Sequence, residues 1–204
     1  MSMIPLGFSG ESMHALIVGG GRVGTRRALM LLEAGARVRV IAPDVSQELD
    51  HAAVESDKLL IERREYAGAA DIGQATIVVA ATSSPAVNER VVRDARAAGR
   101  PVSVANDPAS GTFDFLATHR TGTITIGVSA GGVPMAAQRI RDSIAKRVDS
   151  RYANAVSECA EVRKRTLAAA GADAWRDIAG ELIGDEFCES IEAGTFAVKV
   201  AKWR

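Results

Sequence analysis

A cluster of glycines directly after a short apolar run is the feature that most constrains this chain. The segment Gly19-Gly20-Gly21-Arg22-Val23-Gly24 fits the pattern G-x-G-x-x-G, and the preceding run Ala15-Leu16-Ile17-Val18 is a strand candidate. The residues that follow have helical spacing and end at Gly35, a natural residue just past a helix. A strand, a glycine turn and a helix in this order predict a dinucleotide-binding unit of the Rossmann type.

Each glycine of this segment has a separate expected task. Gly19 would allow the tight turn, Gly21 would let the backbone approach a pyrophosphate, and Gly24 would let the helix pack on the strand. The pyrophosphate would lie at the helix N-terminus, where unpaired N–H groups and the helix dipole favour negative charge. The alternative is a glycine turn with a purely structural role.

The alternation of strand and helix patterns continues along the chain as far as about Gly111. Further short apolar runs alternate with helical spacing and predict strands at Val38–Ala42, Leu59–Ile61, Ile77–Ala80 and Val102–Ala105. Ser84-Pro85 predicts the start of a helix. The fold class is therefore α/β, with a Rossmann-type parallel sheet.

Beyond Gly111 the pattern predicts a hairpin followed by helices. The two hairpin strands are expected at Phe113–Ala117 and Thr123–Val128. Helical spacing at 140–148 leads into a helical tail, with expected breaks at Gly171, Gly180, Gly184 and Gly194. We expect a Rossmann domain over 1–112, a hairpin-plus-helix region over 113–148 and a small helical domain over 149–204.

Two polar residues follow predicted strands and could contact a cofactor. Asp44 stands about 20 residues beyond the glycine motif, where an acid can bind the ribose hydroxyls of NAD, but it also resembles a helix N-cap. Thr82 follows the fourth strand and is either a cofactor contact or an ordinary turn residue. Because Arg37 and Arg39 lie within the second strand, no arginine follows it to receive a 2′-phosphate, and the sequence favours NAD over NADP.

Two loops are candidate sites for chemistry. Asn106-Asp107-Pro108 ends the fifth strand, at an edge of the sheet where open parallel sheets bind ligands. In the segment 129–134, Ser129, Gly131 and Gly132 could hold a substrate carboxylate through exposed N–H groups, or could form a structural turn.

Composition limits the partners and the compartment. The 204 residues carry 25 basic and 25 acidic side chains, and the zero net charge argues against a general nucleic-acid or membrane-surface binder. The two cysteines form no C-x-x-C pair and the three histidines show no metal-ligand spacing, so we expect no metal site. With no apolar run long enough to span a bilayer and no signal-peptide pattern, we expect a cytoplasmic protein.

Several segments together resemble one family. The run from His14 to Val38, then V-V-A-A-T-S-S-P-A-V-N, G-T-I-T-I-G-V-S-A-G-G-V-P and R-I-R-D-S-I are similar to the N-terminal module of siroheme synthases and to stand-alone precorrin-2 dehydrogenases. The resemblance covers roughly Ile4 to Val148, in order and with nearly matching spacing.

The resemblance implies an NAD-dependent oxidation of precorrin-2, a tetrapyrrole, to sirohydrochlorin in a homodimer. It implies that 113–148 is a dimerisation region, and that Arg22, Val23, Pro43 and Asp44 contact the cofactor. Some members also insert ferrous iron, so a bifunctional dehydrogenase and ferrochelatase is an alternative. A non-catalytic NAD-binding, redox-sensing module is another, because a fold alone does not establish an activity.

The loop after the fifth strand departs from the family pattern. Members often carry an acid two residues before the proline, where this chain has Asn106, and the neighbouring Asp107 is the only carboxylate of the stretch. An asparagine cannot accept a proton near neutral pH. Either Asp107 serves as the base, or the chemistry needs little beyond orientation by the cofactor site, with Asp107 forming an Asx-turn or remaining solvated.

Overall fold

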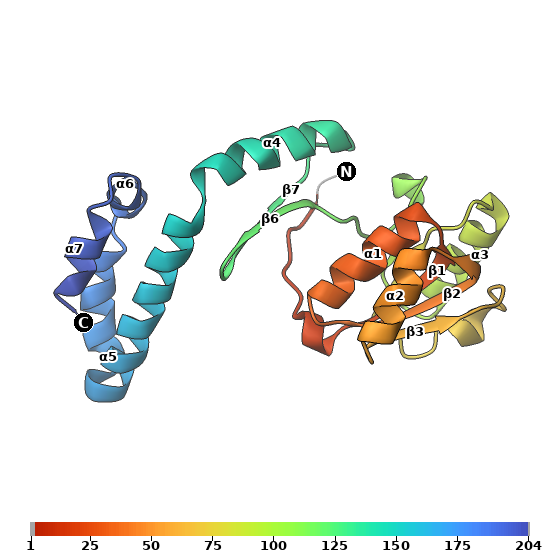
Figure 1. Cartoon of the computed structure of the whole chain (residues 1–204), viewed down its shortest axis with the longest axis horizontal. Coiled ribbons are helices and arrows are strands. Elements are labelled where there is room, and N and C mark those ends of the chain that lie inside the picture. Colours follow the sequence, from red (N-terminus) through yellow and green to blue (C-terminus); the bar gives the residue numbers. More distant parts are fainter. Residues whose placement is uncertain (1–2, 204) are drawn as a thin grey trace. The chain divides into compact units, whose positions relative to one another are not determined.

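The computed structural model describes residues 3–203, which divide into two compact units meeting between Phe115 and Leu116. The first unit contains a five-stranded parallel sheet in the order β3-β2-β1-β4-β5 (Figure 1). Its strands are β1 (His14–Gly20), β2 (Arg37–Val45), β3 (Leu59–Glu62), β4 (Ile77–Ala80) and β5 (Val102–Val104). Its helices are α1 (Arg22–Glu33), α2 (Gln47–Glu55) and α3 (Pro85–Ala97), with the 3₁₀ turns η1 (Gly10–Ser12), η2 (Ala69–Asp71) and η3 (Pro108–Ser110).

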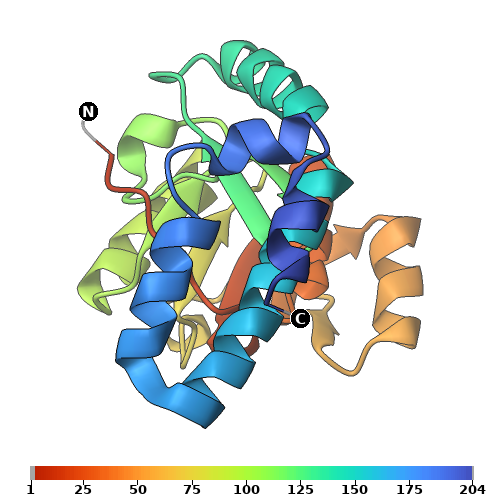
Figure 2. The ribbon, with the colours of Figure 1, turned by 90° about the vertical axis from the view of Figure 1, so that its left-hand side faces the viewer.

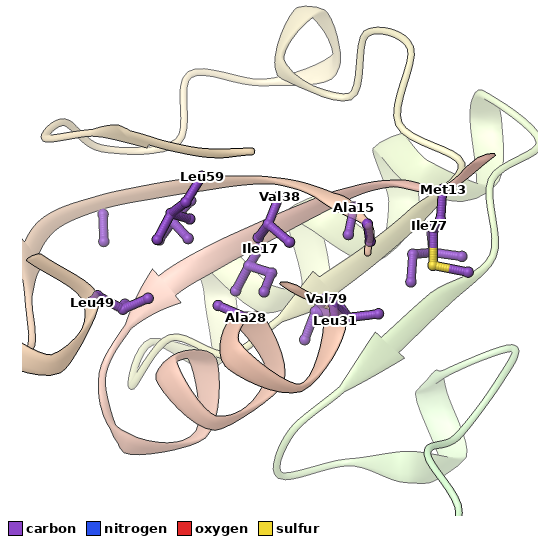
Figure 3. Packing of buried hydrophobic residues seen from close by; sticks show 13 residues of the cluster. Met13, Ala15, Ile17, Ala28, Leu31, Val38, Leu49, Leu59, Ile77 and Val79 are labelled. Carbon is purple, nitrogen blue, oxygen red and sulfur yellow. The ribbon is translucent and has the colours of Figure 1, made fainter. Parts of the chain in front are cut away.

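The sheet is buried on both faces, as a parallel sheet with crossover helices requires. Along β1, Ala15 and Ile17 join one hydrophobic cluster and Leu16 and Val18 join the other. Figure 3 shows the first cluster, in which side chains of α1 and α2 pack on strands β1, β2, β3 and β4. Helix α3 covers the second cluster with Val91, Val92 and Ala95, among others. The fold-class prediction is confirmed.

The end of α1 and the start of α3 lie where capping residues in the sequence predict. Gly35 adopts φ +90° just past α1, a backbone conformation that glycine accepts without strain. Ser84 caps α3 by accepting a hydrogen bond from the Val87 amide, and Pro85 occupies the first helical position. Strand β2 extends past the predicted end at Ala42 to Val45, because a register shift against β1 between Val18 and Gly20 accommodates the extra residues.

The second unit contains an antiparallel hairpin and four helices. The hairpin consists of β6 (Ala117–Thr121) and β7 (Ile124–Val128), and α4 (Pro134–Arg147) packs on both strands. The remaining helices are α5 (Ser150–Leu182), α6 (Phe187–Glu192) and α7 (Phe196–Ala201). Helix α5 bends back at Gly171, which adopts φ +85°, and Figure 2 shows its two arms running in opposite directions. Within the described residues, no helix is long and apolar enough to cross a membrane.

Two details of the predicted elements are wrong. The sequence predicts the first hairpin strand from Phe113, but it begins at Ala117, because Phe113 and Phe115 belong to the first unit and pack against the first hydrophobic cluster of its sheet. Gly180 does not break a helix, since α5 continues through it to Leu182. Gly171 and Gly194, both with positive φ, do mark a bend and a helix boundary.

Candidate functional site

The glycine turn has the backbone geometry that the motif demands. Gly19 ends β1 with φ +115°, and a Cβ atom there would lie 2.4 Å from the Ala81 carbonyl oxygen. A Cβ atom at Gly24 would lie 2.0 Å from the Gly19 carbonyl oxygen, so only glycine lets α1 approach the strand this closely. A Cβ atom at Gly21 would have no atom within 4 Å. Gly21 is therefore free of internal packing and faces open space.

The first turn of α1 presents its amides beside this open space. Gly21 is the N-cap and offers no side chain, and its carbonyl accepts a hydrogen bond from the Thr25 amide at 2.9 Å. The amides before Thr25 have no partner inside a helix, which makes this end a natural anion site. Arg22 is exposed and Val23 is half-buried at the same end. The arrangement fits a pyrophosphate.

The end of β2 and the N-cap of α2 lie directly against the glycine turn. A Cβ atom at Gly20 would lie 2.5 Å from the Asp44 carbonyl oxygen, and the hydroxyls of Thr25 and Ser46 are 2.9 Å apart. Ser46, not Asp44, caps α2, because its hydroxyl accepts the Leu49 amide at 3.3 Å. The capping alternative for Asp44 is therefore wrong.

Asp44 and its neighbour Pro43 are exposed at the end of β2. Within the described residues, no hydrogen bond or ion pair engages the Asp44 carboxylate. A groove of about 930 Å³ runs between α1 and α2, and Asp44 is not among the residues that line it. Its lining residues are Arg22, Val23, Thr25, Arg26, Leu29, Met30, Glu33, Ser46 and Glu48. A free carboxylate at this position can accept hydrogen bonds from ribose hydroxyls.

Thr82 lies on the opposite side of the glycine turn, where a Cβ atom at Gly19 would come within 2.8 Å of its amide nitrogen. Its hydroxyl donates to the Asn88 side-chain oxygen at 2.7 Å and accepts the Ser84 amide at 3.2 Å. Asn88 is buried and also donates to the Thr82 carbonyl. These bonds fix the loop between β4 and α3, and a cofactor contact by Thr82 stays a prediction.

The loop after β5 forms a separate pocket of about 510 Å³ with α3 and the β4–α3 loop. Asn106 and Asp107 both line it, and both are exposed. Asp107 caps η3: its carboxylate accepts the Ser110 amide and the Ser110 hydroxyl. The structure thus gives Asp107 the Asx-type capping contacts, while leaving it at the carboxyl edge of the sheet.

Arg27 on α1 is a charged group whose pKa is lowered by its surroundings. Burial, followed by the neighbouring charge of Arg26, lowers the pKa of Arg27 to about 10. The Arg27 guanidinium lies 4.1 Å from the centroid of the Phe115 ring, a cation–π contact. This contact ties α1 to the end of the first unit and lies outside both pockets.

A family model described as "Putative NAD(P)-binding" matches residues 8–117, more than half of the chain. The chain belongs to this NAD(P)-binding family. Its cofactor class is therefore a nicotinamide dinucleotide, as the glycine turn predicted.

Curated relatives agree with the resemblance seen in the sequence. The siroheme synthase of Pseudomonas paraeruginosa is 36% identical over 166 residues, and that of Saccharophagus degradans is 32% identical over 166 residues. These matches cover 81% of this chain, but the chain spans only 35% and 36% of the two relatives. A solved structure titled "SirC, precorrin-2 dehydrogenase" shares the fold with a TM-score of 0.75 at 23% identity, covering 98% of this chain and 100% of that one.

The second unit contains the other loop that the sequence predicts as a candidate site. Ser129, Gly131 and Gly132 lie between β7 and α4, and the two glycines adopt φ +56° and +84°. Positive φ at both explains why glycine is needed there. The glycine turn, Asp44, Thr82 and Asn106 are brought to one edge of the first unit's sheet, whereas Ser129, Gly131 and Gly132 belong to the other unit.

Sequence reasoning missed three residues that hold this edge together: Thr25, Ser46 and Asn88. Thr25 and Asn88 are buried polar side chains on otherwise apolar helix faces, and that was the signal that could have identified them. Ser46 could have been preferred over Asp44 as a cap only with knowledge of how far β2 extends.

Proposed function

We propose that this chain oxidises precorrin-2 to sirohydrochlorin with NAD as the acceptor. The observation that carries the proposal is the open position at Gly21, at the N-terminus of α1, in a turn whose Gly20 lies against the backbone of Asp44. The similarity to siroheme synthases over 81% of the chain supports the substrate.

The chain's own residues would bind and orient the reactants. Amides at Gly21, Arg22 and Val23 would hold the pyrophosphate, and Asp44 would accept hydrogen bonds from the ribose hydroxyls. Gly19 and Gly24 would keep strand and helix close enough to form this turn, and Pro43 and Thr82 would border it. Asp44 would also repel a 2′-phosphate, which is the reason to favour NAD over NADP.

The reaction removes two hydrogens from the substrate. NAD bound at the glycine turn would supply the acceptor for one of them as a hydride with both electrons, and the other would leave as a proton. Asn106 cannot take that proton, so Asp107 or a water molecule at the same edge would receive it. Catalysis would consist mainly of positioning.

The second unit would supply substrate and subunit contacts. The segment with Ser129, Gly131 and Gly132 would bind a substrate carboxylate through its amides. We further propose a homodimer formed through 113–148 and a cytoplasmic location, as the siroheme synthase resemblance suggests.

Incubation of the purified protein with precorrin-2 and NAD tests the reaction. We expect NADH and sirohydrochlorin to appear together, in equal amounts, and NADP to support a much slower reaction. A parallel incubation with ferrous ion reports whether siroheme also forms. Measurable NAD binding with no NADH above background would reduce the protein to a non-catalytic NAD-binding module.

Parallel Asp107→Ala and Asn106→Ala variants locate the proton acceptor. A loss of turnover in Asp107→Ala alone assigns the role to that carboxylate. Unchanged rates in both variants would remove this loop from the chemistry and leave the proton to water.

A further inference from the structure

The pocket beside Asn106 and Asp107 has a helix wall that the proposed mechanism does not use. Helix α3 lines it at helical spacing with Pro85, Glu89, Arg93 and Arg96, together with Asn88 and Val92. The opposite wall consists of Val104, Asn106, Asp107 and Ser110, and Ser83 completes the lining. All of these residues belong to the first unit, so the pocket is complete within it.

The two arginines of this wall differ in the hydrogen bonds and ion pairs that they already form. Arg96 donates through Nη2 to the Ser110 carbonyl at 2.9 Å, which ties α3 to the loop that carries Asp107. Arg93 has only a loose ion pair, with its Nε 3.7 Å from the Asp94 carboxylate, and its side chain is 71% exposed. A guanidinium has five N–H donors, so most of those of Arg93 are free to bind an anion.

The acids of the pocket do not neutralise Arg93. Glu89 precedes it by one helical turn, yet within the described residues no ion pair joins the two side chains. The Asp107 carboxylate is turned toward the Ser110 hydroxyl and amide. An anion entering the pocket would therefore meet an Arg93 guanidinium that is held only by the loose ion pair to Asp94.

The position of the pocket favours the substrate over the cofactor phosphates. It lies at the carboxyl ends of β4 and β5, whereas Asp44 lies near the carboxyl end of β2, on the other side of β1 in the sheet order. A dinucleotide that binds across this edge with its adenosine ribose at Asp44 directs its reactive end toward β4 and β5. No residue of the glycine turn lines the pocket, so the pyrophosphate site is separate from it.

We propose that Arg93 binds a carboxylate of a polycarboxylate tetrapyrrole in this pocket, with Arg96 holding the loop that forms the facing wall. The proposal rests on the proposed function and extends it by naming a substrate-binding residue. A pocket of about 510 Å³ takes one edge of such a molecule with its acidic side chains. Arg93 then fixes which ring of the macrocycle faces the reactive end of the cofactor.

Binding of uroporphyrin, a stable octacarboxylate porphyrin, tests the site without turnover. Titration calorimetry compares the unaltered protein with Arg93→Ala, Arg93→Lys and Arg37→Ala. Arg37 is a matched control, because it is an exposed arginine at the start of β2 and therefore at the opposite edge of the sheet. We expect Arg93→Ala to weaken binding roughly tenfold or more, since a charge-assisted hydrogen bond is lost. Arg93→Lys should recover part of the affinity.

Three further readouts separate a binding role from a structural one. Arg93→Ala should leave NAD affinity unchanged, should flatten the salt dependence of porphyrin binding, and should raise KM for precorrin-2 while leaving kcat within about twofold. The Arg37→Ala variant should match the unaltered protein in all of them.

The outcomes separate this inference from the proposed function. Porphyrin binding that depends on Arg93, without NADH formation by the unaltered protein, supports the site and refutes the dehydrogenase. NADH formation with an unchanged KM in Arg93→Ala refutes the site and leaves the dehydrogenase standing. The site is also refuted if the unaltered protein does not bind uroporphyrin, or if Arg37→Ala loses as much affinity as Arg93→Ala.

Discussion

The two units of this chain differ in how completely they bury their own apolar surface. In the first unit, a hydrophobic cluster lies on each side of the sheet, and Leu16 and Ile17 have no exposed surface. In the second, no residue of β6 or β7 is buried, and Ala137 is the buried residue of α4. Met135 and Ile140 on that helix are 72% and 46% exposed.

This difference separates a self-contained domain from a region in which helix α4 exposes apolar side chains. The tail helices are closed on themselves, because Tyr152, Val162, Leu182 and Val200 form a third cluster. The hairpin and α4 have no such core. A two-stranded hairpin is marginal without further packing, so under the dimer proposal a second copy would bind over the hairpin and the exposed apolar residues of α4.

The largest expected effect comes from opening a cavity in each core separately. Ile17→Ala should destabilise the first unit, and Leu182→Ala the second, by about 2–5 kcal/mol each, because both side chains are fully buried. The chain has two tryptophans, Trp175 and Trp203, and both pack against the core of the second unit. Tryptophan fluorescence therefore reports that unit alone, while far-UV circular dichroism reports both.

In urea, Ile17→Ala should shift the circular-dichroism transition and leave the fluorescence transition in place, and Leu182→Ala should shift the fluorescence transition. If Ile17→Ala moves both transitions together, the two units unfold as one cooperative body, and the first unit is not a self-contained domain.

A second prediction separates packing from ligand binding inside the first unit. Gly24→Val should destabilise it by about 1–3 kcal/mol, because the new side chain meets the Gly19 carbonyl. Gly21→Val should leave stability nearly unchanged, since φ −76° and ψ −175° suit any residue and the space around it is open.

Gly21→Val should nevertheless abolish NAD binding, as measured by calorimetry, if the backbone must approach the pyrophosphate. Retained NAD affinity in a folded Gly21→Val protein would show that the dinucleotide binds elsewhere.

Whether a feature depends on neighbouring or on distant residues explains whether it could be predicted from the sequence. The glycine turn, the cap at Ser84 and the end of α1 at Gly35 depend on neighbouring residues, so local patterns were sufficient. The Thr25–Ser46 hydroxyl pair and the packing of Phe115 under Arg27 depend on residues far apart in the chain. Asp44 illustrates the limit: its role as a cap was plausible until β2 proved to extend past it to Val45.

The third prediction concerns low pH, which should reduce the stability of the first unit more than that of the second. Asp71 accepts hydrogen bonds from Arg64 at 2.7 and 3.0 Å and from the Ala67 amide at 2.7 Å, and the Arg64 bonds are the main cause of its lowered pKa. In the second unit, Arg147 lowers the pKa of Glu192 in the same way. The Asp71 side chain is only 9% exposed, whereas that of Glu192 is 32% exposed.

A carboxylate with a lowered folded-state pKa stabilises the fold above its unfolded value, about 3.9 for aspartate, and loses that contribution as pH falls through the folded pKa. Asp71→Asn should therefore cost stability at pH 7, and the difference from the unaltered protein should shrink below about pH 3.9. Urea unfolding at a series of pH values measures this. A difference that stays constant with pH would mean that the Asp71 charge does not contribute.

The smallest effect on stability is expected on α4, where the effect on assembly should be clear. Ile140→Asp places a charge on an exposed apolar position and should change the unfolding free energy of the second unit by no more than about 0.5 kcal/mol. If α4 contacts a second copy, the buried charge should convert a dimer to a monomer in sedimentation equilibrium. Gln138→Asp is the matched control, since Gln138 is also exposed but lies on another side of the same helix. A dimer that survives Ile140→Asp, or an unaltered protein that is already monomeric, would mean that α4 is not the dimer contact.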